Sequence, residues 1–212
     1  MSTLEAPIRI LTVDDHPVLR EGIAAMLEAD GRFQVAGFAE SAEAALAAFP
    51  LVRPDITLMD LQMPGMGGLK GIHALRGIFP SARVVVLTTY RGDSNAREAL
   101  AAGASGYLLK TALLDELVQC LQKVHAGGRY ICAELCSDIA THLGEESLTA
   151  RERRILELLA EGLENKRIAG RLSISAETVK SHLGSLFEKL GAHNRSEAIR
   201  IARRRGMLNP DG

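Results

Sequence analysis

ILTVDDHPVLREGI, residues 10–23, places two aspartates between a short apolar run and a segment with helical spacing. The apolar run has the composition of a buried strand, and Pro17 suits the first turn of a helix. A strand that passes into a helix is the repeating unit of parallel sheets, because parallel strands need a long crossover connection. This stretch therefore predicts an α/β domain with two carboxylates at the end of its first strand.

The same alternation continues to about residue 125. Buried strands are predicted at residues 8–13, 33–38, 55–60, 82–88 and 106–109, and helices at 17–29, 41–49, 69–79, 94–103 and 113–127. Ser41 is expected to be the N-cap of the second helix. Five strands alternating with five helices predict a parallel, doubly wound sheet that is covered on both faces.

Strand patterns end near residue 125, and the remainder is predicted to be helical. Residues 126–146 contain Gly127-Gly128, a short helix from about Ala133 to His142 and a polar stretch, which indicates a linker. Residues 149–206 have the spacing of four short helices, and Thr149 with Glu152 forms the capping-box pattern. The predicted divisions are therefore an α/β domain at 1–125, a linker at 126–146 and an all-α domain at 147–212.

Polar residues stand at the ends of four predicted strands. Asp14 and Asp15 follow the first strand, Asp60 ends the third, Thr88 closes the fourth and Lys110 follows the fifth. The carboxyl ends of parallel strands share one edge of the sheet, so these side chains should converge. Clustered carboxylates suit Mg²⁺. A carboxylate can also attack phosphorus, and a metal ion and a lysine would neutralise the phosphoryl oxygens.

Taken singly, each of these residues has an ordinary structural explanation. An aspartate after a strand is usually a turn or helix-cap residue, and a lysine in that position is usually solvated. The placement of all five at strand ends favours a phosphoacceptor site over five independent turns.

Four runs carry a resemblance to the receiver domain of bacterial two-component response regulators: residues 10–23, ITLMDLQMPGMGGL at 56–69, VVVLTTY at 84–90 and ASGYLLK at 104–110. The resemblance implies that this domain has a flavodoxin-like fold. It also implies that a partner sensor histidine kinase phosphorylates Asp60. One departure is Thr89, which stands where receivers often have Ala or Gly.

The resemblance also implies roles for the other residues at this edge. Asp15 is expected to bind Mg²⁺ directly, Asp14 to act mainly through water, and the backbone carbonyl of Gln62 to be a third protein ligand besides Asp60. Lys110 is expected to be the counter-ion of the phosphoryl group. Thr88 is expected to be the switch hydroxyl, and Tyr107 the aromatic side chain whose rotamer follows it.

The C-terminal part has a basic balance and a helix-turn-helix pattern. Residues 147–212 contain 13 Lys and Arg against 8 Asp and Glu, whereas residues 1–125 contain 11 against 14. A short helix, a tight turn at 173–175 and a longer helix from about Ala176 to Leu190 have the spacing of a DNA-binding unit. On the longer helix, Lys180 and Ser181 are expected to contact bases, and Thr178 and His182 phosphates. Lys166 and Arg195 are further phosphate candidates.

This segment resembles the NarL/FixJ (LuxR-type) helix-turn-helix domain through LTARE at 148–152, GLENKRIAGRLSIS at 162–175, ETVKSHLGSLFEKL at 177–190 and Arg195. Two positions depart from the family pattern. Glu164 stands where the family usually has Ser or Thr, so the N-cap is expected to fall on Asn165. Gly184 replaces a larger residue that commonly contacts DNA, which shifts the expected base contacts to Lys180 and Ser181.

Together these features predict a DNA-binding response regulator and not an enzyme. Phosphorylation would control exposure of the helix-turn-helix domain, dimerisation and transcription from a double-stranded promoter. No secretion signal or membrane span is predicted, so the cytoplasm is the expected compartment. A phosphatase would need an acid two residues after Asp60, where Gln62 stands. A ligand-sensing regulator would need an aromatic-lined pocket, and the chain has no Trp.

Overall fold

The computed structural model describes residues 6–89, 92–112, 114–141 and 148–208. Two compact units are present, of which the first comprises residues 1–89 with 96–133 and the second residues 90–95 with 134–212. The break at Ala133 falls inside the predicted linker. The expected helix end at His142 and the polar stretch after it lie outside the described residues.

The first unit is built on a parallel sheet with the strand order β2-β1-β3-β4-β5-β6. The strands are β1 (Ile8–Val13), β2 (Phe33–Ala39), β3 (Ile56–Met59), β4 (Val84–Thr88), β5 (Gly106–Leu109) and β6 (Tyr130–Ile131). The first five follow the doubly wound order in which ligands bind where the strand order reverses. Here that point lies between β1 and β3.

The sequence analysis missed β6. Tyr130 and Ile131 pair in parallel with Gly106 and Tyr107, so the sheet has six strands where five were expected. Two residues are too few to show an alternating pattern, and the short strand therefore looked like part of the linker.

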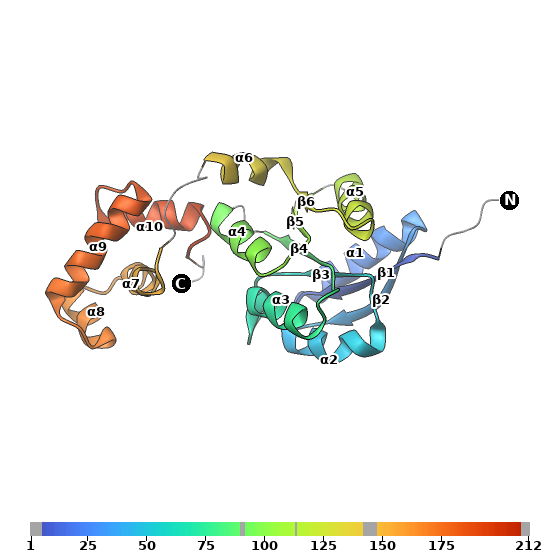
Figure 1. The fold of residues 1–212 in the computed structure, drawn as a ribbon, viewed down its shortest axis with the longest axis horizontal. Helices are drawn as coiled ribbons and strands as arrows, with labels where there is room; N and C mark the ends of the chain where they lie inside the picture. Colours follow the sequence, from blue (N-terminus) through green and yellow to red (C-terminus); the bar gives the residue numbers. More distant parts are fainter. Residues whose placement is uncertain (1–5, 90–91, 113, 142–147, 209–212) are drawn as a thin grey trace. The chain divides into compact units, whose positions relative to one another are not determined.

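Five helices cover the sheet: α1 (Pro17–Asp30), α2 (Ala42–Val52), α3 (Gly67–Ile78), α4 (Asp93–Ala101) and α5 (Leu114–His125). Figure 1 shows α1 and α5 on one side of the strands and α2 and α3 on the other. The predicted caps are confirmed, since Pro17 begins α1 and the side chain of Ser41 accepts a hydrogen bond from the Ala44 amide. The short helix α6 (Ala133–Thr141) follows β6.

Four helices form the second unit's core: α7 (Ala150–Ala160), α8 (Asn165–Leu172), α9 (Ala176–Leu190) and α10 (Arg195–Arg204). The predicted capping box is present, because Thr149 and Glu152 each bond to the other's backbone amide. Buried aliphatic side chains from all four helices meet in one cluster, including Ile155, Ile168, Leu186 and Ile201. None of the described helices has both the length and the apolar character that a membrane crossing requires.

Candidate functional site

The acidic residues lie where the sheet's central strands end. The Asp14 amide donates to the carbonyl of Ala39, and the Asp60 amide donates to the carbonyl of Val13. These bonds continue the strand ladders by one residue, so they fix the backbone beneath each carboxylate. Asp14 and Asp60 are buried, whereas Asp15 is half-buried.

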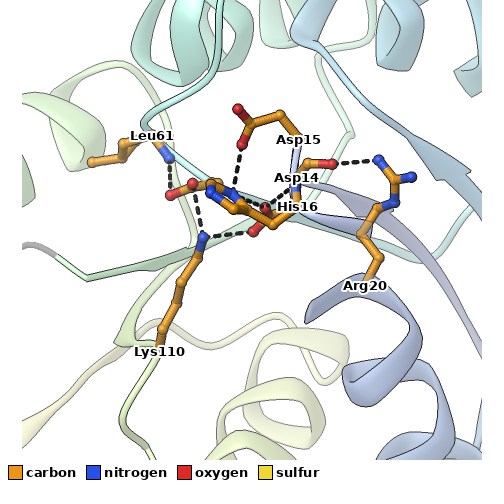
Figure 2. Close-up of polar contacts among 7 residues, drawn as sticks. Asp14, Asp15, His16, Arg20, Leu61 and Lys110 are labelled. Carbon is orange, nitrogen blue, oxygen red and sulfur yellow. Dashed lines mark hydrogen bonds and ion pairs between the residues drawn. The ribbon is translucent and has the colours of Figure 1, made fainter. Parts of the chain in front are cut away.

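Lys110 pairs with both buried carboxylates, and Figure 2 shows its side chain reaching toward Asp14. Its Nζ atom lies 2.6 Å from Asp14 Oδ2 and 2.8 Å from Asp60 Oδ2, and its side chain is only 10% exposed. The Lys110 amide donates to the Thr88 carbonyl, which anchors the residue directly after β5. The structure thus brings together the acids and the lysine that the sequence placed at one edge.

The environment shifts the ionisation of both partners. Burial raises the pKa of Asp60 above its usual value, and the nearby Asp14 acts in the same direction against the opposing Lys110 bond. For Lys110, burial lowers the pKa, but the hydrogen bonds to Asp14 and Asp60 outweigh it and leave the pKa raised. Lys110 therefore stays charged. The ionised form of the Asp60 carboxyl is destabilised in this site, and a bound cation would stabilise it.

Four side chains could hold a cation here. One ligand atom from each of Asp14, Asp15, His16 and Asp60 can be chosen so that all lie within 4.8 Å of one another. Three of the four supply carboxylate oxygen, the ligand that Mg²⁺ prefers, so the residues present fit this ion.

Sequence reasoning missed two residues that hold the acidic loop. The His16 amide donates to Asp14 Oδ1 at 2.9 Å, and His16 Nδ1 lies 2.8 Å from Asp15 Oδ1. Arg20, on the first turns of α1, donates from Nη1 to the Asp14 carbonyl oxygen at 2.6 Å. The adjacency of His16 to two aspartates was a visible signal, whereas nothing in the pattern pointed to Arg20.

The other predicted residues lie around this cluster. Gln62 is half-buried in the loop after β3, and its backbone lies close enough to the Asp60 carboxylate to act against the rise in the pKa of Asp60. Thr88 is fully buried as the last residue of β4. Tyr107 is fully buried in β5 opposite Val86, and burial raises the pKa of its phenol well above the usual range.

The start of α3 is pressed against the phosphoacceptor candidate. The Gly68 amide donates to the Leu61 carbonyl at 3.0 Å, and the Leu61 amide donates to Asp60 Oδ1 at 2.7 Å. A Cβ atom at Gly68 would lie 2.1 Å from the Asp60 carbonyl oxygen. Only glycine fits this contact, which the sequence analysis did not single out.

In the second unit, α8 and α9 form the predicted helix-turn-helix. The turn contains Ser173 in the left-handed conformation (φ 52°), and the Ser175 side chain caps α9 by accepting from the Thr178 amide. The expected N-cap at Asn165 is wrong, because Glu164 is the N-cap and Asn165 is the first helical residue. The Glu164 side chain makes no capping bond to the described residues.

The side of α9 away from the core is exposed and includes both expected base contacts, Lys180 and Ser181. Gly184 lies on the same side, and a Cβ atom there would meet none of the described atoms within 4 Å. Among the expected phosphate contacts, Thr178 and Lys166 are exposed and His182 is half-buried.

Arg195 has an internal role that the sequence did not reveal. Its guanidinium donates to the carbonyl oxygens of Leu159 and Leu163 at 2.6 and 3.0 Å. Leu159 lies at the end of α7 and Leu163 in the turn after it. Arg195 therefore adds a charged donor to carbonyls at this helix end, where Leu159 also accepts from the Gly162 amide.

Replacing Arg195 with methionine is expected to destabilise the end of α7 by about 2 kcal/mol, because two hydrogen bonds to a charged donor are lost. Hydrogen exchange of the full chain should show faster exchange in the last turn of α7. Arg200→Met is the matched control, since Arg200 is 66% exposed and pairs only with Glu197 among the described residues. If Arg195→Met instead lowers the salt dependence of DNA binding without changing exchange, Arg195 contacts phosphate.

An ion pair between half-buried Lys189 and buried Glu152 connects α9 to α7. Lys189 Nζ lies 3.0 Å from Glu152 Oε2, the same oxygen that accepts from the amide and hydroxyl of Thr149. Burial would raise the pKa of Glu152, but these bonds outweigh it and leave the pKa lowered. The start of α7 and the end of α9 are therefore held together by one carboxylate.

Comparisons with known proteins match both units. Residues 10–122 match the family described as "Response regulator receiver domain", and residues 146–202 match "Bacterial regulatory proteins, luxR family". The chain is 35% identical to the transcriptional regulatory protein YdfI of Bacillus subtilis, over 96% of this chain and 99% of the relative. It is 36% identical to the nitrate/nitrite response regulator protein NarL of Escherichia coli, over 92% of this chain and 94% of the relative.

A solved structure of a DNA complex is also similar. The chain aligns with the two-component response regulator RcsB, solved as an RcsB–DNA complex, with 25% identity and a TM-score of 0.71. The alignment covers 94% of this chain and 99% of that one.

Proposed function

Because the chain belongs to the response regulators that join a receiver domain to a LuxR-type DNA-binding domain, we propose that phosphorylation of Asp60 controls its binding to promoter DNA. The family consists of DNA-binding transcriptional regulators and not of enzymes. A sensor histidine kinase would supply the phosphoryl group, and the cytoplasm, where promoter DNA is reached, would be the site of action.

The observation that carries this proposal is the placement of Lys110 between the Asp14 and Asp60 carboxylates. A carboxylate oxygen of Asp60 would attack the phosphorus of the phosphohistidine on the kinase, so that the new O–P bond forms as the P–N bond breaks and the histidine imidazole leaves. Lys110, already within 2.8 Å of that carboxylate, would then pair with the phosphoryl oxygens. Asp14, Asp15, Asp60 and the carbonyl of Gln62 would hold Mg²⁺, which when bound neutralises phosphoryl charge.

Thr88 and Tyr107 would carry the change away from the site. Both are fully buried, and they lie in the paired strands β4 and β5. We propose that the Thr88 hydroxyl donates to the phosphoryl group and that the Tyr107 ring shifts with it. The new arrangement would expose the helix-turn-helix unit and favour a dimer on two half-sites.

The DNA contacts follow from α9. Its exposed side would enter the major groove, with Lys180 and Ser181 at base edges. Lys166, Thr178 and His182 would position the unit on phosphates, and Arg195 would do so only with donors left over from its carbonyl bonds.

The test is promoter binding by the full chain with and without acetyl phosphate and Mg²⁺. Wild type should bind about 5- to 150-fold more tightly after treatment, because a coupling free energy of about 1–3 kcal/mol is typical of such switches. Asp60→Asn should show no response, and Lys180→Ala should weaken binding in both conditions. Equal binding by wild type and Asp60→Asn in all conditions would show that the receiver answers to a different signal.

A further inference from the structure

The side of α9 opposite the core carries two carboxylates. Glu177, Ser181, Gly184 and Glu188 follow a spacing of four, three and four residues, so they share one face of the helix, and all four are exposed. Glu177 lies in the first turn with its side chain 84% exposed. Its Oε2 atom is 3.8 Å from Nζ of Lys180, whose side chain is 69% exposed.

A carboxylate on a DNA-facing surface needs an explanation. Phosphates would repel Glu177, so this side chain cannot serve as a contact to the DNA backbone. An acidic residue in the first turn does interact favourably with the helix dipole. The same stabilisation would be available to an acidic residue on a side of the helix that no phosphate approaches. The position of Glu177 matters because the first residues of a recognition helix lie nearest to the base edges.

The hydrogen-bonding groups in the major groove limit which bases the Glu177 carboxylate could contact. A carboxylate only accepts hydrogen bonds, and the donors in this groove are the amino groups of cytosine and adenine. On adenine the N7 acceptor lies on the same base edge as the amino group and would repel a carboxylate, whereas cytosine itself contributes only the amino donor to this groove. Lysine has the opposite preference and donates to the O6 and N7 atoms of guanine.

We propose that Glu177 is a specificity residue that accepts a hydrogen bond from the N4 amino group of a cytosine, beside a guanine contacted by Lys180. The 3.8 Å separation of the two charged atoms is close to the step of about 3.4 Å between stacked base pairs. The pair would therefore suit two adjacent base pairs. This inference rests on the proposed function, because it takes α9 as the helix that enters the groove.

The experiment selects binding sites from a library of random duplex DNA, using the full chain treated with acetyl phosphate and Mg²⁺. Wild type should select sites with one strongly preferred cytosine in each half-site, and replacing that base should weaken binding about tenfold or more. Glu177→Ala should lose the preference at that position alone. Glu177→Gln should move it toward adenine, because a glutamine amide matches the N6 and N7 atoms of adenine.

Glu188→Gln is the matched control, since it removes the same charge from the same face farther from the start of α9. It should leave the selected sequence unchanged. The inference is overturned if Glu177→Ala keeps the cytosine preference. It is also overturned if the variants at Glu177 and Glu188 both bind every DNA sequence more tightly by the same factor, because the two carboxylates would then act only through their charge. If Lys180→Ala also leaves affinity and selected sequence unchanged, α9 does not contact the bases, and the proposed mode of DNA binding fails with it.

Discussion

Gly68→Ala should abolish phosphorylation of Asp60 and lower the free energy of unfolding of the receiver by about 2–3 kcal/mol. The added Cβ would lie 2.1 Å from the Asp60 carbonyl oxygen and 2.7 Å from the Leu61 Cα atom. Both atoms belong to the backbone and cannot rotate away, so the loop that carries the Asp60 carboxylate must shift. Phosphorylation by acetyl phosphate, followed by mass spectrometry, measures the first effect, and urea denaturation measures the second.

Gly77→Ala is the control within the same helix. A Cβ atom at Gly77 would meet none of the described atoms within 4 Å, so the change should be neutral or stabilise α3 by up to about 1 kcal/mol. Phosphorylation should continue at the wild-type rate. A Gly68→Ala protein that accepts phosphate as fast as Gly77→Ala would disprove the positioning role of this contact.

Lys110→Met should remove the response to acetyl phosphate and cost roughly 3 kcal/mol of stability at neutral pH, because it leaves two buried carboxylates without their cation. The loss should depend on pH. The pKa of Asp60 is already raised in the folded protein, and removing the cation raises it further. The folded variant then takes up a proton before the unfolded chain does, so its stability recovers as pH falls through the raised pKa of Asp60.

Urea denaturation at neutral pH and at a mildly acidic pH measures this recovery. The double variant Lys110→Met with Asp60→Asn is the matched control, because it removes one carboxylate together with the cation and should regain most of the lost stability at neutral pH. Equal deficits at both pH values, or no rescue in the double variant, would mean that Lys110 does not neutralise this pair in the folded state.

The convergence of the acidic residues and Lys110 could be predicted from the sequence because it follows a simple rule of topology. Asp14, Asp60 and Lys110 each follow a buried strand, and parallel strands end at one edge. The approximate spans of the first five strands and of α9 were also predictable, because apolar runs and helical spacing are visible in the sequence. The capping box of Thr149 and Glu152 is a local pattern and was equally visible.

What could not be predicted depends on contacts between distant segments. Arg195 bonds carbonyls of Leu159 and Leu163, which precede it by more than 30 positions, and no periodicity records such a bond. Gly68 is required by the approach of α3 to the backbone of Asp60, which only the folded chain reveals. Likewise, β6 has too few residues to show an alternating hydrophobic pattern. It is defined by its parallel pairing with β5.

The ion pair between Glu152 and Lys189 has a consequence for how such a protein could acquire new DNA target sequences. This ion pair connects α9 to α7 through Lys189, which is half-buried. The exposed residues Glu177, Ser181 and Gly184 are not part of the ion pair. In the proposed mode of DNA binding, mutations on that outward surface would alter which sequence is bound without destabilising the contact between α7 and α9. New regulatory targets could then evolve through a few exposed positions while the framework of the helical unit stays the same.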